Sequence, residues 1–131
     1  GGEFELPHGL AISIAMNHVI RFNAATGNVK RTPFPRYEVY RGQKDYAEIA
    51  RYLGLKGSTD AELVESLCAK IDDLMKAIDV EPTLSANGVT KKHFNQSLDK
   101  LVDLVYNDQC TSANPRQPYL EELKQMLIDQ F

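Results

Sequence analysis

The sequence is poor in cysteine. Cys68 and Cys110 are its two cysteines among 131 residues, and neither forms a CxxC pair. Disulfide scaffolds and zinc fingers need several cysteines at fixed spacings, so neither class is indicated. A reducing environment fits this usage, and we expect the protein to be cytoplasmic.

A long hydrophobic run is also absent. The longest uncharged stretch, from Leu6 to Ile20, has 15 residues, whereas a helix that crosses a bilayer needs about 20. The positively charged start and the small-residue cleavage site of a secretory signal are missing as well. We therefore expect a buried core helix in this stretch, with neither a membrane partner nor export.

Charge of one sign is not in large excess. The formal net charge is −3, with 25% charged and 43% hydrophobic side chains, which is typical of one ordinary globular domain. The segment KRTPFPRYEVYR (30–41) interleaves basic and aromatic residues, as patches that bind single-stranded nucleic acid do. Because it is short and broken by prolines in an acidic chain, we expect no nucleic-acid partner.

No stretch alternates with period two for long enough to predict a strand, whereas apolar residues recur at helical spacing almost throughout. The sequence therefore predicts an all-α fold, a bundle of about five helices. The expected helices cover about residues 7–23, 44–53, 60–78, 91–105 and 118–131. An irregular connection is expected over 23–43, a turn over 80–88 and a polar loop over 107–118.

Short signals mark where several of these helices begin and end. Thr59 with Glu62 three residues later forms a capping-box pattern, and Thr90 is placed to cap the following helix. Gly54 is a suitable left-handed residue after the helix that ends near residue 53. The first helix is apolar on every side, which predicts that protein surrounds it on all faces.

His8 stands between a proline and a glycine at the start of that apolar helix. A neutral imidazole is the commonest protein ligand of divalent metals, and an apolar wall behind it would strengthen the polarising effect of an ion. The alternative is a partly buried histidine that only caps the helix. By the residues alone this alternative is favoured, because one histidine does not make a metal site.

The other two histidines do not complete a site with His8. His18 lies about 15 Å further along a helix and about 280° around it, whereas the ligands of one ion lie only a few Å apart. His93 follows Lys91 and Lys92 and is expected to be solvated.

Several further residues have side chains that could take part in chemistry. Cys110 has no sequence-linked histidine to activate it as a nucleophile, so it is interpreted as a loop or core thiol. The acidic pairs Asp72-Asp73 and Glu121-Glu122 are expected on solvated helix faces. Phe22 is expected in the core, with a position facing a cleft as the alternative.

Separated motifs in a fixed order carry a family resemblance: LPHGLA, HVIRFNA, KRTPFPRY, KDYAEIARYLGL and DQCTSANPR. Together they resemble the C-terminal part of iron-containing (group III) alcohol dehydrogenases, in particular the alcohol dehydrogenase half of bifunctional acetaldehyde-alcohol dehydrogenases. The resemblance extends from Phe4 to Phe131. It implies that residues 1–131 are part of the C-terminal helical metal-binding domain of that family, and that the nucleotide-binding domain is absent from this sequence.

In that family the histidine of the proline-histidine-glycine motif is the last of four metal ligands, and His8 matches it. The resemblance implies a catalytic Fe²⁺ or Zn²⁺ held by His8 together with an aspartate and two histidines that lie upstream in the family. His8 would be a ligand and not an acid–base group. No catalytic or nucleotide-binding residue is expected within this chain.

The resemblance further implies NAD(H)-linked interconversion of an aldehyde and a primary alcohol, such as acetaldehyde and ethanol, by the parent enzyme. The chain alone is expected to be inactive and to bind no metal tightly. The filaments of the bifunctional relatives imply a homo-oligomer or filament. The alternative function is a helical self-association module, which the apolar first helix and the loop from Lys30 to Arg41 would support.

Overall fold

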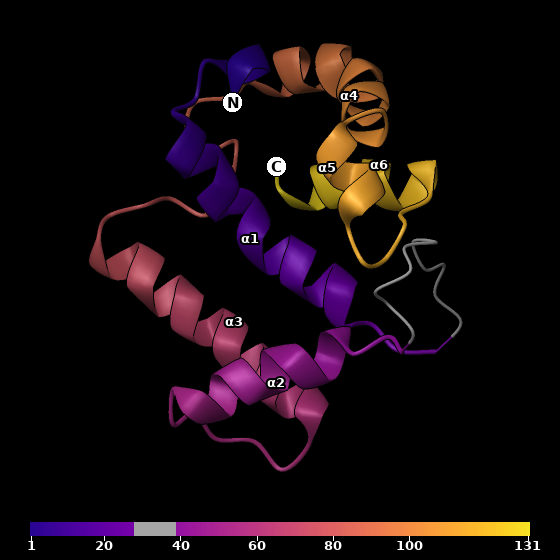
Figure 1. Cartoon of the computed structure of the whole chain (residues 1–131). Helices are drawn as coiled ribbons and strands as arrows, with labels where there is room; N and C mark the ends of the chain where they lie inside the picture. Colours follow the sequence, from indigo (N-terminus) through magenta and orange to yellow (C-terminus); the bar gives the residue numbers. More distant parts are fainter. Residues whose placement is uncertain (28–38) are drawn as a thin grey trace.

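The structure is a computed structural model that describes residues 1–27 and 39–131. Within these two ranges every regular element is a helix (Figure 1). The elements are a 3-10 turn, η1 (Gly2–Phe4), and the helices α1 (His8–Ala24), α2 (Gly42–Tyr52), α3 (Asp60–Ala77), α4 (Lys91–Tyr106), α5 (Gln109–Ala113) and α6 (Leu120–Asp129). The all-α prediction is confirmed, with six α-helices in the described part where the sequence predicts about five.

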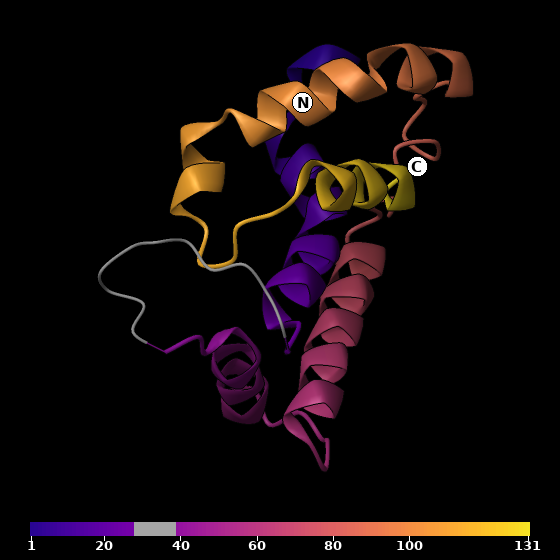
Figure 2. The ribbon, with the colours of Figure 1, turned by 90° about the vertical axis from the view of Figure 1, so that its right-hand side faces the viewer.

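α1 is the central helix and joins two groups of helices. α2 and α3 pack together and lie along the C-terminal half of α1, with α3 running back beside it (Figures 1 and 2). α4 and α6 form the second group, which packs around Leu10 and Ile14 of α1. As a result, α1 contributes side chains to more than one core.

The first core joins α1, α2 and α3. Ile20 and Ala24 of α1 pack with Val64 and Cys68 of α3. The adjoining cluster between α2 and α3 consists of Ala47, Ala50, Leu63 and Leu67. Both of these alanines are completely buried, because their small side chains allow the two helices to approach closely.

The second core is centred on Phe94 of α4, which is only 1% exposed. The ring of Phe4 lies 6.3 Å from it and the ring of Phe131 lies 4.7 Å from it, measured between centroids. Its other buried members are Ile14, Leu84 and Val89. The two ends of the sequence therefore meet on one side chain of α4.

The predicted helix caps are confirmed. The Thr59 hydroxyl accepts a hydrogen bond from the Glu62 N–H at 3.2 Å, and the Glu62 carboxylate in turn accepts one from the Ser58 N–H at 2.6 Å. Thr90 caps α4 by accepting from the His93 N–H. Gly54 follows α2 with φ of +72°, a left-handed conformation that glycine adopts without strain.

The prediction that protein covers α1 on all faces is wrong for the described part of the chain. Ile12, Met16 and Val19 are 46%, 37% and 41% exposed. α2 and α3 cover one side of α1, and α4 with α6 cover part of the rest, so an apolar strip of the helix is left in contact with solvent. Asn17 and Asn23, both buried, add polar groups to the covered side.

Helical spacing predicts two apolar stripes that differ in detail from the packing: Tyr46, Ile49, Ala50 and Leu53 in α2, and Leu63, Leu67, Ile71, Leu74 and Ile78 in α3. In α2 the buried residues are Ala47 and Ala50, whereas Ile49 and Leu53 are largely exposed. In α3 Leu63 and Leu67 are buried as predicted, but Leu74 and Ile78 are exposed and Met75 is buried in their place. The crossing of α2 and α3 selects which side of each helix is buried, and periodicity alone does not supply that angle.

The region predicted as a polar loop over 107–118 contains a short helix, α5. The Asp108 carboxylate caps it by accepting from the Cys110 N–H at 2.7 Å. The segment 28–38 lies outside the described residues. The irregular connection, the basic patch and the filament contact expected around Lys30 to Arg41 therefore fall mainly outside them too. No described helix is long and apolar enough to cross a membrane.

Candidate metal ligand and the apolar face of α1

His8 is the first residue of α1, and the helix places it at the surface. Pro7 is the N-cap residue, with φ of −51°, and its carbonyl accepts a hydrogen bond from the Ala11 N–H at 3.0 Å. Proline suits this position because its fixed φ is compatible with a helix start and no N–H is left without a partner. His8 is exposed, so its imidazole is accessible to a ligand from outside the described chain.

The space beside His8 is open. A Cβ added to Gly9 would meet no atom within 4 Å, and the Gly9 carbonyl is occupied by the Ser13 hydroxyl at 2.8 Å. Gly9 therefore allows an approach from solvent, but no described residue makes one.

The structure does not bring a second histidine to His8. His93 lies on α4, where its ring stands edge-on to Phe4 at 5.0 Å and Nε2 is 3.9 Å from the Glu3 carboxylate. It is half exposed, as the sequence predicts. His18 is half-buried further along α1. Among the described residues, no group of three or more histidine, cysteine, aspartate or glutamate side chains could hold a metal ion.

The donor set of this chain therefore fits a metal only in part. A catalytic zinc-type site uses about three protein ligands and keeps one position open for substrate. An exposed imidazole at the start of a helix fits one of these ligands. Within the described residues it belongs to no group of three or more such donors, so it fits as a contributor to a shared site.

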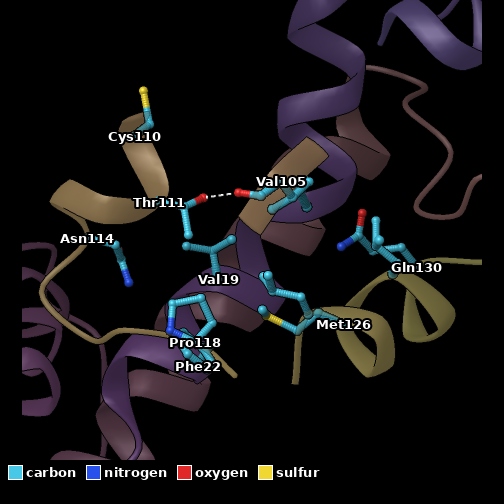
Figure 3. A pocket seen from close by; sticks show the side chains of 12 residues that line it. Val19, Phe22, Val105, Cys110, Thr111, Asn114, Pro118, Met126 and Gln130 are labelled. Carbon is cyan, nitrogen blue, oxygen red and sulfur yellow. Dashed lines mark hydrogen bonds between the residues drawn. The ribbon is translucent and has the colours of Figure 1, made fainter. Parts of the chain in front are cut away.

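The face of α1 that begins at His8 leads to an apolar cavity. Ile12, Ala15, Val19 and Phe22 follow His8 by 4, 7, 11 and 14 residues, which places them on one side of a helix with 3.6 residues per turn. The last three line a cavity of about 360 Å³ between α1, α4, α5 and α6 (Figure 3). The sequence predicts that α1 is apolar, but the other walls of the cavity come from residues between 105 and 130, which only the fold brings to it.

Few polar groups line this cavity. The Thr111 hydroxyl donates to the Val105 carbonyl at 2.6 Å (Figure 3), so that hydroxyl is already engaged. Asn114 and Gln130 also line the cavity. The cavity thus favours an apolar group and offers amides at its edge.

Cys110 lies on α5 beside the cavity and is exposed. Its hydrogen bond with Asp108, and the negative charge of that carboxylate, raise the pKa of the thiol above its ordinary value. A thiol with a raised pKa stays protonated at neutral pH and is a weak nucleophile. Cys110 was expected in a loop or in the core, whereas the structure places it exposed on the short helix α5.

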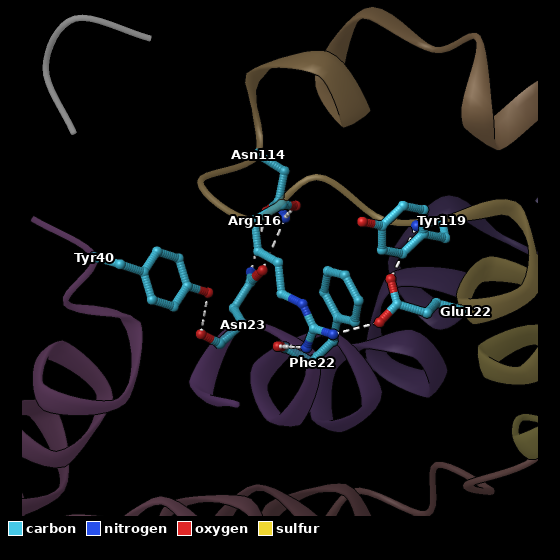
Figure 4. A network of polar contacts seen from close by, with 7 residues as sticks. All are labelled: Phe22, Asn23, Tyr40, Asn114, Arg116, Tyr119 and Glu122. Carbon is cyan, nitrogen blue, oxygen red and sulfur yellow. Dashed lines mark hydrogen bonds and ion pairs between the residues drawn. The ribbon is translucent and has the colours of Figure 1, made fainter. Parts of the chain in front are cut away.

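A polar network fastens the α5–α6 connection to the end of α1 (Figure 4). The Asn23 and Asn114 side-chain amides bond each other reciprocally, at 3.1 and 2.8 Å. The Arg116 guanidinium donates to the Phe22 carbonyl at 2.6 Å and lies 3.8 Å from the centre of the Phe22 ring. Tyr40 donates its hydroxyl proton to the Asn23 carbonyl, which adds the start of the α2 region to the same network.

Sequence reasoning did not find this network. Asn23 and Asn114 are 91 residues apart, and a single sequence carries no signal for such a pair. Glu122 was expected to be solvated, but it is half-buried and pairs with Arg116. Its partner in the acidic pair, Glu121, is exposed as predicted. The cavity and the network together explain how the DQCTSANPR motif (108–116) is held.

Asp72 also differs from its expected role. It is exposed, as predicted, but it accepts a hydrogen bond from the buried Asn17 side chain at 2.7 Å. Phe22 combines the two interpretations made for it, since it is half-buried and its ring lines the cavity.

Comparison with known proteins gives a match over the whole chain. The family model described as the Fe-containing alcohol dehydrogenase family, C-terminal, matches residues 1–131. The aldehyde-alcohol dehydrogenase of Clostridium acetobutylicum is 40% identical over 129 residues, which is 98% of this chain and 15% of that protein.

Two further relatives also match almost the whole of this chain. The bifunctional aldehyde-alcohol dehydrogenase of Escherichia coli is 38% identical over 133 residues, which cover all of this chain and 15% of that protein. The NADPH-dependent butanol dehydrogenase of Clostridium saccharobutylicum is 32% identical over 126 residues, 96% of this chain and 29% of that protein. The chain thus spans about 15% of the length of the first two relatives.

Proposed function

Because the chain belongs to the iron-containing alcohol dehydrogenase family, we propose that residues 1–131 are the C-terminal helical part of an enzyme that interconverts aldehydes and primary alcohols. The proposed coenzyme is NAD(H), and acetaldehyde with ethanol is the proposed substrate pair. Two relatives are named as aldehyde-alcohol dehydrogenases, one of them bifunctional, and this supports both activities in one longer protein. A third relative is named as an NADPH-dependent butanol dehydrogenase. The coenzyme and the length of the substrate's carbon chain are therefore to be measured.

The observation that carries the proposal is the placement of His8. It stands exposed at the start of the central helix α1, in the position that matches the last metal ligand of the family. We propose that His8 is one ligand of a catalytic Fe²⁺ or Zn²⁺ and that the other ligands come from outside this chain. Lewis-acid stabilisation of negative charge on the substrate oxygen is the chemistry that such an ion supplies when bound.

Other residues of this chain fix the position of the imidazole and form its surroundings. Anchoring of α1 through Ile14 and Asn17 fixes the direction of its first turn. The apolar Ile12, exposed one turn from His8, would exclude water once a second surface covers it. In this scheme the imidazole of His8 would donate a lone pair to the ion and would transfer no proton.

Substitution of the ligand tests the proposal directly. We expect His8→Ala in the full-length enzyme to lower bound iron or zinc and to reduce alcohol oxidation more than about 100-fold, since even outer-shell partners of a metal typically contribute 10–100-fold. Metal analysis of the purified protein and NAD-linked ethanol oxidation give the two readouts. His93→Ala, which removes another exposed histidine, on α4, should leave both near normal.

Unchanged metal content in His8→Ala would refute the ligand assignment. If metal is lost but ethanol and acetaldehyde are not turned over by the unsubstituted enzyme, the ligand assignment stands and the substrate proposal fails. The 131-residue chain by itself should bind less than one equivalent of metal, and a chelator should remove it.

A further inference from the structure

His18 occupies a small polar cavity where three helices meet. The cavity has a volume of about 170 Å³ and lies between α1, α3, the end of α6 and the segment 82–83. Its lining includes Asn17 and His18 of α1, Asp72 of α3 and Asp129 of α6. The imidazole is half-buried there, and it is ten residues away from the proposed metal ligand.

Charged groups face His18 from each of the three helices. Arg21 of α1 lines the cavity, but its guanidinium is paired with Glu65 at 2.8 Å. Asp72 of α3 already accepts from the Asn17 amide at 2.7 Å, and Asp129 of α6 accepts from Gln125 at 2.7 Å. The segment 82–83 contributes only Pro82 and Thr83, which are uncharged.

Burial outweighs the two carboxylates. Loss of hydration lowers the pKa of His18 below the ordinary histidine value, with a smaller contribution in the same direction from Arg21, while Asp129 and Asp72 act in the opposite direction. A folded state with a lowered histidine pKa is most stable above the unfolded value of about 6.5 and loses that stability as the pH falls. A proton on His18 therefore favours any arrangement that lets water reach the ring.

The contacts around the cavity differ in how firmly they are held. Asn17 is 7% exposed and donates to both the Cys68 carbonyl, at 3.0 Å, and Asp72, so it fixes α1 to α3. Behind it, Ile20 packs into the first core. On the other side, α6 contributes only its last residue, Asp129, to the cavity lining. There α1 is held by the packing of Ile14 in the core that contains Leu84, and none of the described side-chain hydrogen bonds joins α1 to α6. The α6 side is therefore the side that can open.

We propose that His18 is a proton-sensitive joint, at which acidification opens the contact of α1 with the end of α6 and with residues 82–83 while the contact of α1 with α3 stays closed. The joint couples the two helix groups of the fold to pH. It uses no residue of the proposed metal site, so its outcome is independent of the proposed function.

Hydrogen exchange at two pH values tests this joint. Amide exchange, corrected for its intrinsic pH dependence, is measured at pH 7.5 and pH 5.5 for peptides from 80–88, α3 and α6. We expect exchange in 80–88 and the end of α6 to rise severalfold at pH 5.5, and exchange in α3 to stay unchanged. His18→Asn, which keeps a polar side chain of similar reach but cannot be protonated, should abolish the rise. His93→Asn is the matched control and should retain it.

An equal rise in His18→Asn would overturn the proposal, and so would an equal opening of α3. Proton NMR of the unsubstituted protein gives a second test that needs no variant. The His18 ring protons should titrate with a midpoint below about 6.5, the ordinary histidine value, and the amide resonances of the end of α6 should shift with the same midpoint. A midpoint at or above that value, or α6 resonances that do not follow it, would also overturn the joint.

Discussion

At the residue scale, Gly42 sets how closely α2 can approach α1. A Cβ at this position would lie 2.1 Å from the Asn23 carbonyl oxygen and 3.1 Å from the Tyr40 hydroxyl. Both neighbours belong to the network that holds the end of α1. The absence of a side chain at residue 42 is therefore a condition for that network.

Gly42→Ala should destabilise the chain by about 1–3 kcal/mol, since added atoms in a tight contact force the backbone to move. Urea unfolding followed by circular dichroism gives the free energy of unfolding. Gly9→Ala is the matched control, because Gly9 also lies in the first turn of a helix and a Cβ there meets nothing. It should leave stability unchanged or raise it by up to about 1 kcal/mol. Equal effects of the two substitutions would show that the close contact is absent.

Some features of the fold and the site are determined by neighbours in the sequence, and others by contacts between distant residues. The helix start at Pro7 and His8, and the cap at Thr59, follow from neighbours in the sequence, and the sequence predicts them. Gly42 and the Asn23–Asn114 pair have partners that only the tertiary fold supplies. Spacing along the chain carries no signal for them, so they could not be predicted.

At the scale of the helices, α6 shows how one face of a short helix carries its packing. Leu123 is 5% exposed and packs inward, whereas Leu120, one turn earlier, is 46% exposed. The Glu122 carboxylate, between them, accepts from the Tyr119 N–H at 2.9 Å and also pairs with Arg116. The helix is thus fixed by one buried leucine and by a polar clamp at its start.

Truncation of the two leucines separates these contributions. Leu123→Ala should lower the free energy of unfolding by about 2–5 kcal/mol, as large-to-small changes in a core do. Leu120→Ala, the same change on the exposed side, should cost less than about 1 kcal/mol. Thermal and urea unfolding of both variants measure the difference. Comparable losses would mean that α6 packs in another orientation.

Helix periodicity predicted the existence and type of the long helices because each one buries an apolar side. It did not predict α5, whose five residues have no apolar repeat and depend on the cap from Asp108. It also misplaced the buried side of α2. Ile49 and Ala50 are adjacent apolar residues, and the sequence does not reveal which of them meets α3. Contact between helices decided these points.

At the scale of the whole molecule, α1 is shared by cores that otherwise have separate helices. Ile14 belongs to the core of α4 and α6, and Ile20 to the core of α2 and α3. The two side chains are six residues apart on one continuous helix. Unfolding of either group therefore removes support from the helix that the other group needs.

We expect a single cooperative transition as a consequence. Ile20→Ala should lower the unfolding midpoint by the same amount whether the signal comes from α3 or from α6, with a loss of about 2–5 kcal/mol. Residue-resolved NMR through a urea series supplies both signals. A midpoint that falls at α3 and stays constant at α6 would show that the two groups unfold independently.

The contacts that the rings of Phe4 and Phe131 both make with Phe94 have a topological consequence. Because both rings contact the same side chain, residues 4 and 131 are held close to each other in space. A unit of this kind tolerates circular permutation and can be spliced into a longer polypeptide with little displacement of its flanks. A short glycine-serine bridge between residues 131 and 1, with new ends opened at the turn between α4 and α5, should preserve the helix packing.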